Sequence, residues 1–132
     1  MRIHTLLLFA IVLVSSCANK VENTKSEMKK DTKQLRHIVL LKFNETATDL
    51  DIQKVEAAFI DLPNKISEIK SFEWGLNNSP EGLNKEFTHC FFLTFDSEEA
   101  RSIYLPHPAH KAFGDILKPH LKDVLVLDYW VK

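Results

Sequence analysis

The sequence predicts a small α+β domain in which helices cover one face of an antiparallel sheet. Three observations lead to this fold class. Apolar runs typical of strands are interleaved with segments whose apolar residues recur at helical spacing. Clusters of Asn, Pro and Gly separate several of these segments. The chain has 132 residues, 45% of them hydrophobic and 27% charged, which suits one globular domain and is too short for two.

The first predicted strand lies at residues 36–43 (RHIVLLKF). Its side chains alternate between two faces, one carrying His37 and Val39 and the other Ile38 and Leu40. Both faces are apolar. This pattern predicts a strand that is buried on both sides.

A helix is expected next, at residues 49–61, where large apolar residues recur every three or four positions and Pro63 provides the stop. Residues 69–76 predict the second strand, in which aromatic residues alternate with polar ones. Residues 77–85 (NNSPEGLNK) have the composition of a loop.

The third predicted strand, residues 87–95, is again apolar on both faces. Residues 96–99 (DSEE) then begin a helix, because they combine a capping side chain with acids in the first turn. This helix reaches Tyr104 and is broken by Pro106. Pro108 begins another helix, at a position where a missing N–H costs nothing.

The last helix runs to about residue 118, and residues 123–131 (DVLVLDYWV) predict the final strand. The order is therefore β-α-β-β-α-β with a broken second helix, which is the ferredoxin-like arrangement. Helices would cover only one face of its four-stranded sheet, yet the strands are apolar on both faces. We therefore expect a homodimer in which two sheets pack face to face.

Residues 1–16 are expected to be an export signal. Arg2 supplies a positive charge, and residues 6–14 (LLLFAIVLV) form an apolar run that is too short to span a bilayer. The run ends at residues 14–17 (VSSC), which resemble a bacterial lipobox. This resemblance implies a lipoprotein of the bacterial cell envelope, with Cys17 lipidated and first in the mature chain. An ordinary cleaved signal and an uncleaved helix remain the alternatives.

The rest of the chain divides into residues 17–34, the lipidated Cys and a flexible tether, and residues 35–132, the folded domain. The tether has too few apolar residues to offset its ordering entropy. The folded domain holds eleven Lys and Arg against fifteen Asp and Glu, a net charge of -4. A nucleic-acid partner is therefore not expected. The remaining cysteine, Cys90, is expected to be a buried structural thiol.

Motifs at four places carry a resemblance to a known family. They are HIVLLKF at residues 37–43, Thr88-His89, Tyr104-x-x-His107-Pro108-x-His110, and Asp128-Tyr129. With them, residues 36–132 resemble the stress-responsive A/B barrel family, a set of dimeric α+β barrels. The resemblance implies that fold and a homodimer. It implies little about chemistry, because most members have no assigned reaction.

Tyr104 and His110 are the candidate catalytic pair. A histidine at a helix N-terminus tends to stay neutral and able to accept a proton. A tyrosine that polarises a carbonyl beside such a base could support proton abstraction next to that carbonyl. Plant polyketide cyclases of the family use this Tyr and His to close a linear polyketide. The resemblance implies that Tyr104 orients the substrate carbonyl and that His110 is the base.

Three more histidines are candidate pocket or binding residues: His37, His89 and His107. His37 and His89 each begin a predicted strand, so we expect both imidazoles near one end of one sheet face. In the competing interpretation the His-Pro-x-His turn is structural and its side chains bind backbone groups. Metal binding by His107 and His110, completed by His37 or His89, is a further alternative. No HExxH motif is present, and neither a metal ion nor another cofactor is expected.

Two functions follow from these observations. The first is a lipid-anchored homodimer that binds a small hydrophobic or aromatic molecule. The second is a cofactor-independent cyclase or lyase that uses Tyr104 and His110. Only the enzyme needs both side chains within hydrogen-bond reach of an open pocket.

Overall fold

The computed structural model describes residues 33–132, so the predicted signal and most of the tether, including Cys17, lie outside the described residues. The strands are β1 (Leu35–Phe43), β2 (Ser71–Leu76), β3 (His89–Phe95) and β4 (Leu121–Trp130). The helices are α1 (Asp49–Ile60), α2 (Leu62–Lys65), α3 (Glu98–Tyr104), α4 (Pro108–Leu117) and the 3₁₀ turn η1 (Lys118–His120). Within these residues we find no helix with the length and apolar character needed to cross a membrane.

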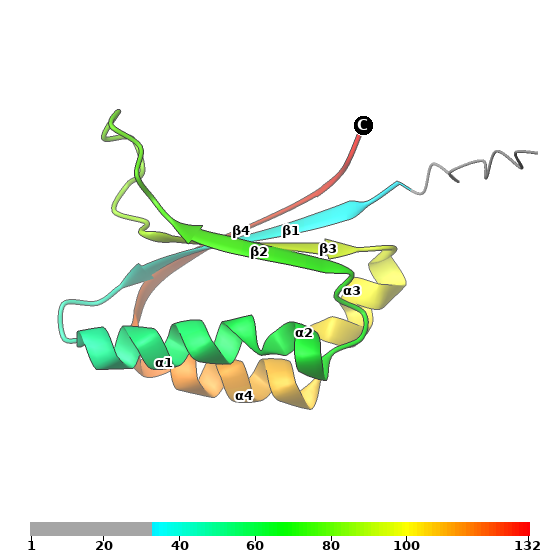
Figure 1. Cartoon of the computed structure of the whole chain (residues 1–132), viewed down its shortest axis with the longest axis horizontal. Helices are drawn as coiled ribbons and strands as arrows, with labels where there is room; N and C mark the ends of the chain where they lie inside the picture. Colours follow the sequence, from blue (N-terminus) through cyan, green and yellow to red (C-terminus); the bar gives the residue numbers. More distant parts are fainter. Residues whose placement is uncertain (1–32) are drawn as a thin grey trace, which may run out of the picture. The chain divides into compact units, whose positions relative to one another are not determined.

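The four strands form one antiparallel sheet in the order β2-β3-β1-β4. The central strand β1 pairs with β3 on one side, where Leu35 lies opposite Phe95, and with β4 on the other, where Leu35 lies opposite Trp130. All helices lie on one side of this sheet (Figure 1). The predicted ferredoxin-like α+β fold is confirmed.

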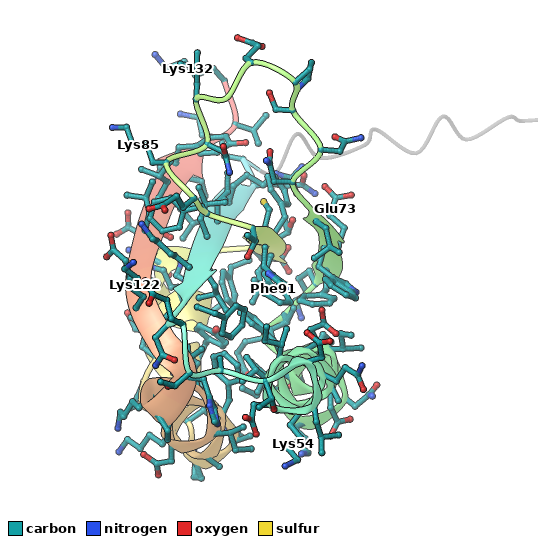
Figure 2. All side chains as sticks on the ribbon, turned by 90° about the vertical axis from the view of Figure 1, so that its left-hand side faces the viewer. Lys54, Glu73, Lys85, Phe91, Lys122 and Lys132 are labelled. Atoms are coloured by element: carbon teal, nitrogen blue, oxygen red, sulfur yellow. The ribbon has the colours of Figure 1, made fainter. Side chains whose placement is uncertain are left out.

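The hydrophobic core fills the space between the sheet and the helices. Phe59 of α1 stacks on Phe91 of β3 with ring centroids 4.0 Å apart, and Phe113 of α4 lies 4.5 Å from Phe59. Figure 2 shows Phe91 in this interior, above α1. The predicted amphipathic spacing of the first helix is confirmed by its buried Val55 and Phe59. These stacked rings join α1 and α4 to the middle of the sheet.

The opposite sheet face carries apolar side chains that no helix covers. Leu125 and Leu127 on β4 are 41% and 49% exposed, and Ile38 of β1 and Phe92 of β3 are partly buried. We call this surface the open face; its apolar members are Ile38, Leu40, Cys90, Phe92, Leu125, Leu127 and Tyr129. The β2–β3 loop rises on the same side of the sheet (Figure 1). The second apolar face predicted for the strands is therefore present, and it is uncovered in the single chain.

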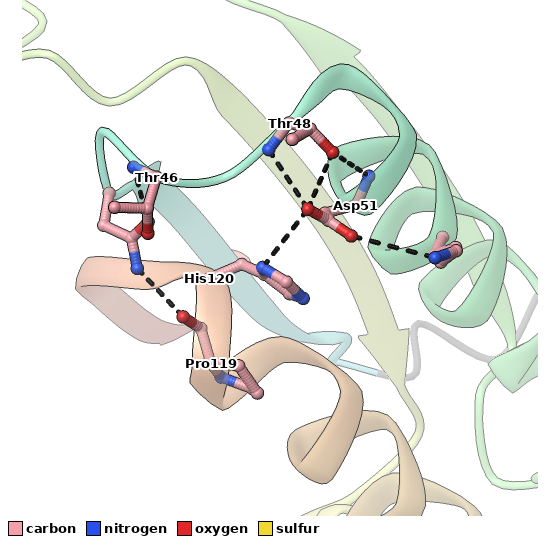
Figure 3. A network of polar contacts seen from close by, with 7 residues as sticks. Thr46, Thr48, Asp51, Pro119 and His120 are labelled. Atoms are coloured by element: carbon pink, nitrogen blue, oxygen red, sulfur yellow. Dashed lines mark hydrogen bonds and ion pairs between the residues drawn. The ribbon is translucent and has the colours of Figure 1, made fainter.

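The start of α1 is fixed by a reciprocal cap. The Thr48 side chain accepts a hydrogen bond from the Asp51 N–H, and the Asp51 carboxylate accepts one from the Thr48 N–H. The same carboxylate lies 3.9 Å from His120 Nδ1 of η1 (Figure 3). The hydrogen bonds from Thr48 hold the pKa of Asp51 below its usual value. This network joins the start of α1 to the segment that leads into β4.

The element boundaries differ from the predicted ones by a few residues. Pro63 does not simply stop the first helix: it lies in the first turn of the short helix α2, where proline is well tolerated. The final strand begins at Leu121, two residues earlier than predicted, directly after η1. On α4, Phe113 and Leu117 are buried against the core, whereas Ile116 is 42% exposed.

Candidate functional site

Tyr104 is the last residue of α3, and its side chain is completely buried. Its hydroxyl is the one buried side-chain polar atom in the described chain that has no hydrogen-bond partner. Burial raises the pKa of Tyr104 well above its usual range, and the negative charge of Asp128 adds to this effect. The phenol therefore stays protonated, and its O–H is available as a donor.

His110 lies in the first turn of α4, beside Tyr104. The two ring centroids are 4.4 Å apart. His110 Nδ1 lies 2.9 Å from the Leu105 carbonyl oxygen, which can only accept, so Nδ1 carries the proton. In the neutral ring Nε2 is then an acceptor, and it has no hydrogen-bond partner among residues 33–132. Tyr104 and His110 thus lie side by side, but no hydrogen bond joins the Tyr104 hydroxyl to the His110 ring.

His107 has a structural role. It is the N-cap of α4, and its Nδ1 accepts a hydrogen bond of 3.1 Å from the Ala109 N–H. This contact satisfies one of the backbone donors that a helix start leaves unpaired. His107 therefore fits the structural interpretation of the His-Pro-x-His turn. His110 fits it in part, because its Nδ1 binds a backbone carbonyl while its Nε2 does not.

His37 completes the cluster from the start of β1. Its ring centroid lies 5.6 Å from that of Tyr104, and the side chain is nearly inaccessible. Its Nδ1 donates to the Asp128 carboxylate over 2.8 Å. Burial lowers the pKa of His37 below 6.5 although Asp128 opposes the shift, and the nearby His110 and Arg101 also lower it. His37 is therefore predominantly neutral at pH 7, with Nε2 as an acceptor.

His89 is not part of this cluster. We expected it beside His37 at one end of the sheet face, and this is wrong because β1 and β3 run antiparallel. In the observed register His37 faces Leu93 while His89 faces Leu41, so the two imidazoles lie on one face at opposite ends. His89 Nε2 instead lies 3.0 Å from Glu56 of α1, and its Nδ1 lies 2.8 Å from the Thr88 hydroxyl. Both ring nitrogens are thus engaged.

Metal binding gains no support from this arrangement. In the part of the chain that the structure describes, no group of three or more His, Cys, Asp or Glu side chains is placed to hold a metal ion. His107 and His110 each use Nδ1 for a backbone group. Both histidines lie at the start of α4, but they are not placed to bind one metal ion together.

Sequence reasoning assigned no site role to three charged residues that contact these histidines or their partners: Asp128, which it named only within the Asp128-Tyr129 motif, Arg101 and Glu56. Asp128 carried a signal, because it follows Val124 and Val126 on the helix-facing side of its strand. A charged residue at an inward position of an apolar strand usually has a buried partner. Arg101 and Glu56 lie on helices among other charged residues, where nothing in the sequence distinguishes them.

The site is closed in this conformation, because the Tyr104 side chain is completely buried. Three hollows of the described surface have volumes of about 280 to 350 Å³, and neither Tyr104 nor His110 lines them. Two of these hollows meet at Gly75 and Cys90, on the open face. Burial, reinforced by the charge of Glu73, raises the pKa of Cys90. This thiol therefore stays protonated at neutral pH.

Comparisons with known proteins identify the family and the fold of the chain. Residues 35–131 match the family described as the Stress responsive A/B Barrel Domain. The chain is 37% identical to the stress-response A/B barrel domain-containing protein HS1 of Arabidopsis thaliana, over 72% of this chain and 87% of that protein. It is 30% identical to olivetolic acid cyclase of Cannabis sativa, over 72% of this chain and 94% of that enzyme.

Solved structures show the same fold. Hydroxynitrile lyase from Passiflora edulis superposes with a TM-score of 0.72 at 25% identity, covering 76% of this chain and 95% of the lyase. A dimeric protein of ferredoxin-like fold from Bacteroides fragilis NCTC 9343 gives a TM-score of 0.62 at 29% identity, covering 74% of this chain and 96% of that one.

Proposed function

This chain belongs to the stress responsive A/B barrel domain family, and on that premise we propose that it binds a small, largely apolar carbonyl compound beside Tyr104. The observation that carries the proposal is the buried Tyr104 hydroxyl without a partner. A buried O–H that lacks an acceptor costs about 1–3 kcal/mol, and a ligand carbonyl would recover this energy. The aromatic rings of Phe95 and Phe113 around the cluster suit an apolar or aromatic ligand body.

Binding requires a movement of α3, because Tyr104 is fully buried in the closed conformation. Few polar contacts hold this seven-residue helix to β4: Arg101 with Asp128 at 3.3 Å, and the Trp130 indole N–H with Glu98 at 3.4 Å. A displacement of α3 would give a ligand access to Tyr104 and His110 together.

The test is the affinity of the full chain for acetophenone, an aromatic ketone, measured by calorimetry. Tyr104→Phe removes one hydrogen bond to the carbonyl, so we expect an affinity about threefold to tenfold weaker. Tyr129→Phe removes the other tyrosine hydroxyl of the chain, which lies on the open face, and is the matched control. Equal affinities for the two variants would contradict the proposed site.

A second candidate function, a cofactor-independent cyclase or lyase, is favoured by the tautomer of His110. Nδ1 donates to Leu105, which leaves Nε2 as a base beside the Tyr104 donor. This pair could remove a proton next to a carbonyl while the phenol stabilises the enolate oxygen. The cyclase and lyase relatives support the same chemistry.

Proton abstraction can be measured directly as exchange of the acetophenone methyl hydrogens in D₂O, followed by NMR. We expect the full chain to accelerate the exchange, and His110→Ala to abolish the acceleration while acetophenone still binds. If the native chain binds acetophenone without any acceleration, the binding function stands and the enzyme function fails.

We also propose that the protein is a homodimer whose open faces pack together, and that Cys17 anchors it to a membrane of the bacterial cell envelope. The dimeric ferredoxin-like relative and the apolar open face support the first statement. The lipobox-like sequence at residues 14–17 supports the second. Labelling with a radioactive fatty acid should mark the native chain and not Cys17→Ser.

A further inference from the structure

Arg101 lies at the edge of the candidate site without belonging to the predicted catalytic pair. It lies on α3, three residues before Tyr104, and its side chain is mostly buried. Its guanidinium Nη1 lies 3.3 Å from Asp128 Oδ1, the same carboxylate oxygen that accepts the hydrogen bond from His37. The same carboxylate oxygen, Asp128 Oδ1, thus contacts both the His37 imidazole and the Arg101 guanidinium.

We propose that Arg101 is a positioning residue of this site: it balances the charge of Asp128, so that His37 donates from Nδ1 as a neutral ring and presents Nε2 as an acceptor toward the ligand beside Tyr104. The part of this inference that concerns the ligand rests on the proposed function. The neutral form of His37 that it assigns does not depend on whether a ligand binds.

Charge counting explains why the guanidinium is needed. Asp128 and Arg101 together are neutral, so a proton added to His37 would leave a net positive charge in a nearly inaccessible place. Without Arg101, the attraction of the uncompensated Asp128 carboxylate would act more fully against the burial that keeps His37 neutral. Arg101 therefore adds to burial in favouring the form of His37 with an acceptor at Nε2 over the form with donors at both nitrogens.

The groups around His37 come from four elements. Asp128 of β4 favours its charged form, whereas Arg101 of α3 and His110 of α4 disfavour it. Tyr104 of α3 and Phe95 of β3 contribute ring contacts, with centroids 5.6 and 6.1 Å from that of His37. Arg101 is the one permanently charged cation in this set. Its removal leaves the charge of Asp128 uncompensated by any permanent cation, which should favour the protonated form of His37.

The test is an NMR titration of the histidine rings in the full chain, with Arg101→Met, Arg101→Lys and Lys111→Gln. In Arg101→Met we expect a higher pKa for His37 than in the native chain, and the neutral Nδ1–H signals to be lost at a higher pH. Arg101→Lys keeps a cation and should restore most of the native behaviour. Lys111→Gln removes an exposed cation from α4 and is the matched control.

Binding of 4-hydroxyacetophenone across the same pH range tests the inference with a ligand, because its phenol can donate to Nε2 of neutral His37 while its carbonyl accepts from Tyr104. This hydrogen bond is lost as the pH falls through the pKa of His37, so Arg101→Met should move that loss of affinity to higher pH. If the native chain does not bind acetophenone, the proposed function fails, while the titration still decides the role of Arg101. An unchanged His37 titration in folded Arg101→Met, with Arg101→Lys the same, would overturn the inference.

Discussion

The hydroxyl of Tyr104 couples function to stability at the level of a single atom. In the ligand-free chain it is buried without a partner, so its removal should stabilise the fold. We expect Tyr104→Phe to raise the free energy of unfolding by about 1 kcal/mol while it weakens acetophenone binding. Denaturant unfolding at neutral pH measures the change. Tyr129→Phe removes a hydroxyl from a side chain that is exposed in the single chain and lies at the end of the open face, and it should alter stability by less than about 0.5 kcal/mol. A less stable Tyr104→Phe would mean that the hydroxyl already has a partner.

His37 should make stability depend on pH. Its pKa is lower in the folded chain than the ordinary value of 6.5, so the unfolded chain takes up a proton there more readily. The free energy of unfolding should therefore fall as the pH drops below 6.5, down to the folded-state pKa. Unfolding curves at pH 7.5 and 5.5 measure this loss. His37→Gln should reduce it, and His120→Gln is the control. An identical pH dependence in native and His37→Gln chains would contradict the assignment.

At the scale of the element, the reciprocal cap at the start of α1 stabilises this helix through contacts within four residues of the chain. Thr48 satisfies a backbone donor at the helix start, so Thr48→Ala should lower the free energy of unfolding by about 1 kcal/mol. Thr48→Ser keeps the hydroxyl and should retain most of it. Because this end of α1 also faces His120, hydrogen exchange should increase in η1 as well as in α1. If hydrogen exchange increases only in α1, the start of α1 and the 3₁₀ turn η1 are not coupled through the Asp51–His120 contact.

Element types were predictable because their signals are local. The apolar alternation of β1, the acidic start of α3 and the proline at the start of α4 each lie within a few residues. The position of His89 was not predictable in this way, because it depends on the direction of β3 relative to β1. Likewise, the contact between Arg101 and Asp128 joins α3 to β4, and no local pattern in either segment indicates it.

The candidate site was likewise predictable only in its local features. Tyr104 ends α3 and His110 lies in the first turn of α4, so a single short motif could identify both residues. Whether the pocket is open depends on how α3 rests against the sheet, which the motif does not describe. The full burial of Tyr104 is therefore a property of packing that only the structure could reveal.

At the scale of the whole molecule, the open face should control assembly. Phe92 lies in the middle of this face, so Phe92→Asp should place a charge in the proposed interface and convert a homodimer into a monomer at micromolar concentration. Sedimentation of the full chain in detergent measures this. Leu50→Asp puts the same charge on an exposed position of α1 and is the control. A native chain that sediments as a monomer would contradict the dimer.

The same interface would cover Cys90 on the open face. Alkylation with iodoacetamide at pH 8 should therefore be slow in the native chain and faster in Phe92→Asp. The pKa of the Cys90 thiol, raised by burial, keeps the alkylation rate low in both chains. Equal rates in the two chains would indicate that Cys90 is not covered by a partner.

The position of β1 in the middle of the sheet has a consequence for synthesis of the chain. This strand emerges from the ribosome before the other three, yet its partners are β3 and β4, the last two of the four to be synthesised. Its long-range pairing makes the nascent domain slow to complete, because Leu35 cannot meet Trp130 until all the segments between them have been synthesised. Until then both edges of β1 are free to pair wrongly, and a chaperone that holds this segment should raise the yield of folded protein.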